Sequence, residues 1–543
     1  MPEIVKKLSS PHIWARVFDD KSFTSDFEEI ILPQYLRTCR WFAGKSSTIK
    51  HVRIQTTLPL AVDTRVFYIL ILEAQFKESF SQEYVLPLSF IQQPNEVEAL
   101  ESKAICRLVT DKTDGFIYDA LHVPAFRELI FEYIIKKKIV QSGTGTLKFE
   151  KAESFTVKST KKTDSQVLKA EQSNTAIIYN NQYFFKWFRR VFPETNPDLE
   201  ISRYLNQNHF NHTAQYLGDI SWNRQHNPPV SFGLLQQKLP NEGDAWTWML
   251  DQVNRFFIQL DKDPKASFDY KAKEKLFEPI KPKSLAPQVI ELASPRWIES
   301  IVLLGKRTAQ MHLALARDHS QTDFKPVPFN PDYSVWLKNK VSNLFDQRIG
   351  LLEKNINRLR GLAKEYGKIF WDRRNEVLEE ILGFDESKLC SMRTRVHGDY
   401  HLGQVLIQDM DFFILDFEGE PESTIRDRKI KQSPLKDVAG MLRSFHYAIY
   451  ATLFDESKKW TRTQSDRFEI AERFYQLICG LYMHGFINTA IKGGLDIGYK
   501  PEIKYLLRYH LLEKAVYELG YELNSRPDWA IIPLRGIMKI IGH

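Results

Sequence analysis

The feature that most constrains how this chain can fold is a pair of short apolar runs, 405–407 and 412–415, separated by a polar turn. Two such runs at this spacing predict a tight β-hairpin. The chain enters the hairpin shortly after Asp399 and leaves it at Asp416. We therefore expect one rigid hairpin to carry a carboxylate at each of its chain ends.

The residues around this hairpin have the spacing of a phosphoryl-transfer site. His397, Asp399 and Gln404 fall where the catalytic loop of protein kinases, H-R-D-x-x-x-x-N, has His, Asp and Asn. Asp416-Phe417-Glu418 falls where D-F-G would. We predict that Asp399 is the catalytic base, that Gln404 and Asp416 bind Mg²⁺, and that Glu418 lies close to the metal. The alternative is that the two tripeptides belong to unrelated turns beside a hairpin.

A second set of residues has the character of an ATP-binding strand and helix. Lys186 lies in the aromatic run 183–188, where strand alternation puts it on one face with Phe184 and Phe188. A lysine on such a face needs an anionic partner, and we predict the ATP phosphates and Glu200 of the next helix. The alternative is that its ammonium group reaches water at the surface. The remaining predicted ATP contacts are Ser173, Asn174 and Thr175 of the preceding glycine-free turn, and Gln237 of the hinge candidate.

The remaining patterns predict an α+β protein with the two-lobed fold of the eukaryotic protein kinases and an extra N-terminal α/β cap. Strand patterns dominate before a Pro-, Gly- and Asn-rich break at 239–244, and helical patterns follow it, including a long run at 333–370. We predict a cap over residues 1–95, a β-rich ATP-binding lobe over 96–238 and a helical lobe over 239–543. The cap either rigidifies the small lobe or mediates assembly.

Composition limits the other classes of protein. A chain of 543 residues is too long for one ordinary core. The 4 scattered cysteines indicate neither disulfides nor a zinc site, which favours a reducing, cytoplasmic compartment. No signal peptide or membrane-spanning run is present, so we predict no membrane association. The net charge of +7 comes without a dense basic tract, so we predict no nucleic-acid partner.

Taken together, these segments resemble those of the bacterial maltokinases, which belong to the aminoglycoside-phosphotransferase-like branch of the kinase fold. The resemblance runs over nearly the whole chain. It is carried by R-W-F-A-G-K at 40–45, E-Q-S-N-T at 171–175, N-P-D-L-E at 196–200, L-G-K-R-T-A at 304–309, the loop 397–407, D-F-E-G-E-P at 416–421, S-P-L-K-D-V-A-G-M-L-R-S at 433–444, K-A-V-Y-E at 514–518 and N-S-R-P-D-W at 524–529. One departure is the strand 183–188, which is more aromatic than the aliphatic strand typical of the family.

The resemblance implies an activity and its cofactors. It implies transfer of the ATP γ-phosphate, with Mg²⁺, to the anomeric hydroxyl of maltose. The product, maltose 1-phosphate, would feed α-glucan or glycogen synthesis from trehalose, with trehalose synthase as a partner. Two alternatives stay open. One is a kinase for another small sugar, such as glucosamine or glucose, and the other is a non-catalytic pseudokinase that partners trehalose synthase.

The helix predicted over 501–524 is the candidate sugar site. A disaccharide presents hydroxyl edges and apolar ring faces, so its site needs polar or charged groups beside aromatic platforms. The resemblance favours this role for Lys514, Tyr517, Glu518, Glu522 and Arg526. The alternative is an ordinary solvated row of ion pairs at i, i+4 spacing.

Overall fold

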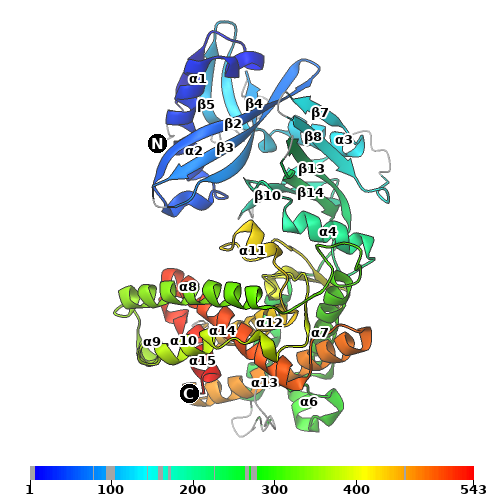
Figure 1. Ribbon diagram of the computed structural model, residues 1–543, viewed down its shortest axis with the longest axis vertical. Coiled ribbons are helices and arrows are strands. Elements are labelled where there is room, and N and C mark those ends of the chain that lie inside the picture. Colours follow the sequence, from blue (N-terminus) through cyan, green and yellow to red (C-terminus); the bar gives the residue numbers. More distant parts are fainter. Residues whose placement is uncertain are drawn as a thin grey trace. The chain divides into compact units, whose positions relative to one another are not determined.

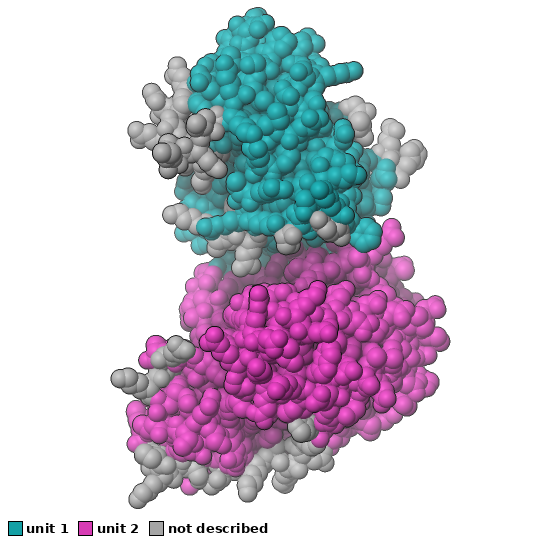
Figure 2. Space-filling model, turned by 90° about the vertical axis from the view of Figure 1, so that its left-hand side faces the viewer, with its two compact units in different colours: residues 1–203, 214–239 teal, residues 204–213, 240–543 magenta. Residues whose placement is uncertain are grey.

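The computed structural model describes residues 6–542 except for 78, 93–103, 143–144, 157–162, 169–172, 225–226, 263–267, 269, 271–277, 456 and 458–459. The chain divides into two compact units, coloured separately in Figure 2 and described one at a time. Unit 1 contains residues 1–203 and 214–239, and unit 2 contains residues 204–213 and 240–543. The break that we predicted before residue 239 thus lies one residue from the boundary at 239/240.

Unit 1 begins with the cap sheet, drawn in blue in Figure 1. In the described part of the chain its strands have the order β1-β5-β6-β4-β3-β2, with β12 beside β4. Their bounds are β1 (Lys7–Ser10), β2 (Ile49–Val62), β3 (Arg65–Phe76), β4 (Gln82–Ile91), β5 (Ala104–Thr110), β6 (Asp114–Asp119) and β12 (Arg190–Val191). Helices α1 (Lys21–Asp26) and α2 (Leu32–Thr38) pack on one face. Because β5 and β6 belong to this sheet, the cap boundary predicted at 95, which lies outside the described residues, comes too early.

The second sheet of unit 1 contains the predicted ATP-binding strands. Its order is β7-β8-β13-β14-β11-β10-β9. The bounds are β7 (Ile139–Ser142), β8 (Gly145–Lys151), β9 (Ser165–Val167), β10 (Asn174–Tyr179), β11 (Tyr183–Phe188), β13 (Tyr216–Arg224) and β14 (Val230–Gln237), with helices α3 (Pro124–Ile135) and α4 (Pro197–Gln207). One residue, Arg189, separates β11 from β12, so the chain passes directly from the second sheet into the cap sheet.

A continuous hydrophobic core joins the two sheets of unit 1. Strand β3 is buried on both faces. Its residues Ile69 and Ile71 belong to the core that also contains Phe185 of β11, while Leu70 and Leu72 pack with the cap helices. A strand with two buried faces needs apolar residues at consecutive positions, which explains its unbroken apolar run. The cap is therefore part of the folded body of unit 1.

Unit 2 is mostly helical, as predicted. Its helices are α5 (Ala245–Asp261), α6 (Pro287–Ala293), α7 (Pro295–Leu315), α8 (Pro331–Asn355), α9 (Gly361–Asp372), α10 (Arg374–Leu382), α11 (Ile425–Lys429), α12 (Leu435–Leu453), α13 (Gln464–Gly493), α14 (Lys500–Ser525) and α15 (Ile531–Ile540). Its strands are β15 (Val327–Pro328), β16 (Met392–Arg393), β17 (Val405–Gln408) and β18 (Asp411–Ile414). Helix α12 is buried along most of its length and contacts α5, α13 and α14.

One helix prediction in unit 2 is wrong. The run 333–370 forms two helices, α8 and α9, rather than one. Gly361 begins α9 with a φ of +49°, which lies in the left-handed region and interrupts a continuous helix. Within the described residues, none of the helices has both the length and the apolar surface needed to cross a bilayer.

Candidate active site

The predicted hairpin is present in unit 2. Strands β17 and β18 pair around Asp409 and Met410, whose φ values of 51° and 62° are typical of a two-residue hairpin turn. At the open end, the Leu415 N–H donates to the Gln404 carbonyl at 2.9 Å. This pairing places Gln404 beside Asp416, and its Nε2 donates to Asp416 Oδ2 at 2.9 Å. The two predicted metal ligands therefore lie together.

The loop before the hairpin is anchored by a carboxylate that the sequence analysis missed. Asp437, in the first turn of α12, accepts the His397 N–H at 2.8 Å and the Gly398 N–H at 2.9 Å. His312 Nε2 lies 3.2 Å from the same carboxylate. Burial alone would raise the pKa of Asp437, but the hydrogen bond to His312 and the nearby imidazoles lower it below its usual value. The sequence signal that could have identified Asp437 was its position in the segment 433–444, which the resemblance had singled out.

Close backbone packing explains why glycine stands where protein kinases have arginine. Gly398 has a φ of +88°, and a Cβ atom there would lie 3.1 Å from Gly419 Cα. Asp416 also has a positive φ, 66°, which is uncommon for a residue other than glycine. His397 Nε2 lies 2.9 Å from the Leu415 carbonyl and so connects the two segments. The loop before the hairpin and the segment after it are thus held against each other.

Asp399 lies in this loop with its carboxylate bonded to a lysine. Lys514 Nζ of α14 donates to Asp399 Oδ1 at 2.8 Å. Burial would raise the pKa of Asp399, but the charge and hydrogen bond of Lys514 together with the charge of His401 outweigh it and hold the pKa below the usual value. The carboxylate is therefore ionised at neutral pH and able to accept a proton from a hydroxyl group.

One imidazole links the two predicted acidic centres. His401 Nε2 lies 4.0 Å from Asp399 Oδ2. Burial lowers the pKa of His401, and the charges of Asp399 and Asp416 both oppose that shift. The charges of the predicted base and of the predicted metal ligand therefore both act on this one imidazole.

A buried network of alternating charges lies beside Lys514. Glu420 is 3.1 Å from Lys340 and 3.7 Å from Lys436, and Glu513 is 2.6 Å from Lys436. Burial would raise the pKa of Glu420, but the charges of Lys340, Lys436 and Lys514 lower it to about 2. The sequence analysis missed this network because its members come from separate helices and loops. Lys340 and Lys436 are paired within it, and Lys514 is the lysine that contacts Asp399.

Gln404 and Asp416 fit a magnesium ion by their chemistry. Carboxylate and amide oxygens are hard ligands of the kind that Mg²⁺ prefers. Because the Gln404 amide nitrogen donates to Asp416, the amide oxygen of Gln404 remains for a cation. Proteins commonly hold Mg²⁺ by one or two such groups and leave the other positions to phosphate oxygens and water. The pair therefore has the donor set that the predicted role requires.

In unit 1, Lys186 contacts a carboxylate that the sequence analysis did not name, while the predicted contact with Glu200 stays a prediction. Lys186 Nζ lies 2.6 Å from Asp198 Oδ2, and both side chains are largely buried. Asn196 caps this helix end, accepting the Asp198 N–H on its Oδ1 at 2.8 Å. We predicted Glu200 as the partner. Because α4 begins at Pro197, its first turn brings Asp198 to the lysine.

The turn predicted to contact ATP includes a residue whose hydroxyl group is already bonded within the protein. Thr175 is fully buried, and its Oγ1 accepts a hydrogen bond from Arg189 Nε at 2.8 Å. The prediction that this hydroxyl contacts ATP is therefore wrong, because it is used within the protein. Ser173 is exposed, and the Asn174 amide donates to its Oγ at 3.3 Å. Residues 171–172 of this turn lie outside the described residues.

The hinge candidate forms the end of β14. Gln237 is exposed, but its N–H donates to the Gln215 carbonyl at 2.9 Å. The next N–H, that of Lys238, donates to the Gln182 carbonyl at 2.8 Å. These two backbone donors, which would otherwise read an adenine edge, are thus used in the sheet. A role for Gln237 in ATP binding remains a prediction that depends on its carbonyl or side chain.

Helix α14 places some of the predicted sugar residues at the base. Lys514 contacts Asp399, and its Nζ lies 4.7 Å from the centre of the Tyr517 ring. Glu518, one turn further on, accepts hydrogen bonds from Arg443 Nε and Nη2 at 2.9 and 2.6 Å. Both bonds end on the same oxygen, Oε2, so the Glu518 carboxylate is engaged by α12. Lys514 and Tyr517 therefore lie together beside Asp399, and a sugar contact for Glu518 stays a prediction.

The other two predicted sugar residues do not join this pair. Glu522 is 1% exposed and is paired with Arg526 at 2.8 Å, so the prediction that it faces a sugar is wrong. Arg526 follows Lys514 by twelve residues, about 18 Å along an α-helix, so the two do not contact the same sugar ring. Regular i, i+4 spacing did not reveal that Glu522 lies on the buried face of α14.

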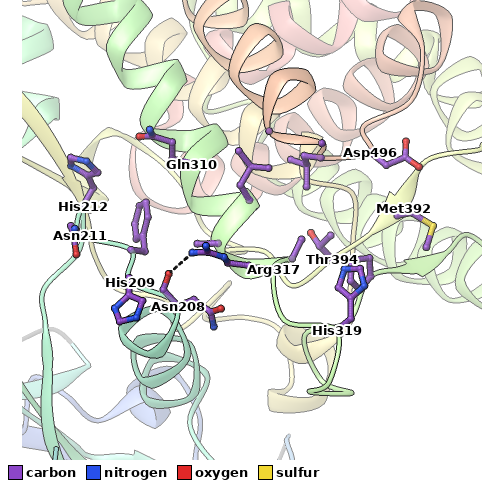
Figure 3. Close-up of a pocket in the computed structure, with 18 residues that line it drawn as sticks. Asn208, His209, Asn211, His212, Gln310, Arg317, His319, Met392, Thr394 and Asp496 are labelled. Atoms are coloured by element: carbon purple, nitrogen blue, oxygen red, sulfur yellow. Dashed lines mark hydrogen bonds between the residues drawn. The ribbon is translucent and has the colours of Figure 1, made fainter. Parts of the chain in front are cut away.

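A cavity of about 710 Å³ lies elsewhere in unit 2 (Figure 3). Arg317, from the end of α7, donates to the Asn208 carbonyl at 3.2 Å across it, and His209 and His319 also line it. Its volume is in the range of small-molecule sites. Among the residues described as its lining, none is a predicted catalytic, metal or sugar residue. A larger cavity of about 960 Å³ in unit 2 is lined by residues that include Arg526, and Asp399 is not among the described residues that line either cavity.

Comparison with known proteins bears on the cap and the fold. Residues 35–122 match the maltokinase N-terminal cap domain. The glucosamine kinase of Mycolicibacterium smegmatis is 21% identical over 364 residues, which cover 67% of this chain and 76% of that protein. The glucosamine kinase of Streptacidiphilus jiangxiensis is 23% identical over 366 residues, which cover 67% of this chain and 70% of that protein.

Solved structures extend this likeness over nearly the whole chain. A glucosamine kinase in complex with glucosamine, ADP and inorganic phosphate has a TM-score of 0.59 at 16% identity, covering 94% of this chain and 99% of that one. A second crystal form of glucosamine kinase has a TM-score of 0.61 at 16% identity, covering 98% and 100%. These matches confirm the predicted α+β fold with an added cap. This chain is therefore a homologue of the glucosamine kinases that carries a maltokinase N-terminal cap domain.

Proposed function

We propose that this chain is a sugar kinase that transfers the γ-phosphate of ATP to a hydroxyl group of a small sugar. The observation that carries the proposal is the setting of Asp399. Its ionised carboxylate lies in a loop anchored by Asp437, close to the Gln404–Asp416 pair. A base and a magnesium-binding pair on one hairpin are the parts that phosphoryl transfer needs.

The roles of the residues follow from their contacts. Asp399 accepts a hydrogen bond from the acceptor hydroxyl and takes its proton as the new oxygen–phosphorus bond forms and the bond to the ADP oxygen breaks. The entering hydroxyl competes with Lys514 for the carboxylate, and the displaced ammonium can donate to a sugar oxygen. Mg²⁺ held by Gln404 and Asp416 would neutralise phosphate charge. Lys186, paired with Asp198, would bind the phosphates of ATP.

We favour maltose as the acceptor, phosphorylated at its anomeric hydroxyl to give maltose 1-phosphate. Two observations support this choice. The cap matches that of the maltokinases, and the cation beside the base, Lys514, would repel a sugar that carries an ammonium group. The second candidate is glucosamine, which the names of the relatives favour. A role in glycogen synthesis, trehalose synthase as a partner and a cytoplasmic location stay predictions of the resemblance.

A screen of acceptor sugars tests the proposal. ADP release is measured with Mg-ATP and maltose, glucosamine, glucose or trehalose, and each product is identified by ³¹P and ¹H NMR. Maltose should give the highest kcat/KM, with the phosphorus coupled to an anomeric proton. A preference for glucosamine would change the assigned acceptor sugar but would leave the proposed phosphoryl transfer from ATP unchanged. A protein that neither turns over any sugar nor binds Mg-ATP by calorimetry would be the pseudokinase.

A further inference from the structure

The cap has no assigned chemistry, yet one buried arginine connects it to the strands that carry the predicted ATP residues. Arg189 follows β11 and lies three residues after Lys186. Its Nη2 donates to Oδ2 of Asp119, at the end of cap strand β6, at 2.5 Å. Its Nε donates to Thr175 Oγ1, at the start of β10, at 2.8 Å. One guanidinium group therefore bonds both sheets of unit 1.

Further contacts hold this group on the cap side. The Arg189 carbonyl accepts the N–H of Val85 in β4 at 2.8 Å, and its guanidinium carbon lies 4.7 Å from the centre of the Trp41 ring. The hydroxyl of Tyr35 lies 3.4 Å from the Asp119 carboxylate. Trp41 belongs to the segment 40–45 that the sequence analysis singled out and that the proposed activity does not use.

The setting of the pair makes it a rigid connection. Arg189 is 0% exposed, Asp119 2% and Thr175 0%. Burial would lower the pKa of Arg189, but the charge and hydrogen bond of Asp119, with Tyr35 and Cys39 beside it, together raise the pKa above the usual value. A buried guanidinium that loses its carboxylate would be left as an uncompensated charge in a region without water, so opening the pair is strongly unfavourable. Thr175 is thereby fixed to the cap.

The register of the strands shows what this connection controls. Thr175 pairs with Trp187, and its neighbour Ala176 pairs with Lys186. The exposed turn residue Ser173 lies two residues before Thr175. A shift at Thr175 would therefore move both the turn predicted to contact phosphate and the strand that carries the ammonium group.

We infer that the cap acts, through the Asp119–Arg189–Thr175 chain of hydrogen bonds, as a positioning device for the ATP side of the site. Asp119, Arg189 and Thr175 are positioning residues and do not contact ATP. The inference rests on the proposed function only in that ATP is the ligand. It assigns the segment around Trp41 and the end of β6 a part in nucleotide affinity rather than in sugar choice.

Conservative variants test this inference. Thr175→Val removes only the hydroxyl group, and Arg189→Lys keeps a charge for Asp119 but cannot also bond Thr175. Both should raise the Kd for Mg-ATP, measured by calorimetry without sugar, and the KM for ATP about tenfold, since small displacements of binding groups are costly. The kcat and the KM for sugar should change less than about twofold. Thr175→Ser should recover most of the lost affinity.

A matched control separates positioning from loss of stability. Val17→Ala leaves a cavity in the cap core at the short helical segment Trp14–Asp19, and should lower Tm without changing the Kd for ATP. If Thr175→Val and Arg189→Lys weaken ATP binding no more than Val17→Ala does, the inference is overturned. Wild-type protein that binds ATP but phosphorylates no sugar would end the proposed function and leave this inference standing. Wild-type protein that binds no ATP would end both.

Discussion

The carboxylate of Asp399 has the clearest role of any single residue. Asp399→Asn keeps the shape and a hydrogen bond to Lys514 but removes the proton acceptor. We expect kcat to fall by about 10² or more, with ATP affinity unchanged, because a general base typically contributes that much. A coupled ADP-release assay and calorimetry measure the two effects. Asp409→Asn, the same change in the exposed hairpin turn, is the control. Near-normal kcat in Asp399→Asn would show that another group takes the proton.

A second prediction at the residue scale concerns the lysine that lowers the pKa of Asp399. Lys514→Met removes the main group that opposes burial, so the pKa of Asp399 rises. The carboxylate is then protonated at higher pH, and the acid limb of the kcat/KM profile should move up by about one pH unit or more. Lys492→Met, at an exposed lysine of α13, is the control. An acid limb that stays in place would show that Lys514 does not set this pKa.

At the scale of an element, the loop 397–404 depends on close backbone packing. Gly398→Ala adds a Cβ atom at a φ of +88° and 3.1 Å from Gly419 Cα. We expect a loss of about 1–3 kcal/mol in the free energy of unfolding and a lower kcat, because Asp399 must move with its neighbour. Denaturant unfolding and steady-state kinetics measure both.

Gly350 provides the opposite case for the same substitution. It lies inside helix α8, where a Cβ atom would meet nothing within 4 Å. Gly350→Ala should therefore stabilise the protein by about 0.5–1 kcal/mol and leave kcat unchanged. If Gly398→Ala behaved like Gly350→Ala, close packing would not be the reason for glycine in the loop.

Elements differ in how far the sequence reveals them. The hairpin and the helical character of unit 2 were predictable because their apolar patterns are local. Contacts between residues that are far apart in the sequence could not be predicted in this way. Asp198 meets Lys186 because of where α4 begins, and Asp437 reaches the loop only after α12 has packed against it. Glu522 shows the same limit, because i, i+4 spacing does not tell which face of a helix is buried.

At the scale of the whole molecule, a buried histidine should make stability depend on pH. Burial lowers the pKa of His446 to about 4, below the usual value of 6.5. Below pH 6.5 the unfolded chain therefore takes up a proton that the folded chain does not. The free energy of unfolding should fall by on the order of 3 kcal/mol as pH falls from about 6.5 to 4. Glu420, whose pKa is lowered to about 2 from 4.5, adds a loss only below about pH 4.5.

Urea unfolding between pH 4 and 8 measures this dependence. His446→Gln should be less stable at pH 7 but should show a flatter profile between pH 4 and 6.5. Asp466, a capping partner at the exposed start of α13, provides a control, since Asp466→Asn should leave that part of the profile unchanged. A variant at His446 that kept the full slope would assign the titration to other groups.

The boundary between units 1 and 2 was predicted more accurately than the end of the cap. The break at 239 is marked by proline, glycine and asparagine, so composition revealed it. The end of the cap was placed too early because β5 and β6 return to the first sheet after a segment with little pattern of its own. Sequence shows where an element ends more clearly than which sheet it joins.

Strand β3, with side chains buried on both of its faces, has a practical consequence. Removal of the cap would take away the residues that pack on one side of the core around Trp187. Apolar side chains of the second sheet would then be exposed to water. A shortened version of the protein should then aggregate instead of surviving as a minimal enzyme. A chimaera that exchanges the cap between homologues will therefore need to include both sheets of unit 1.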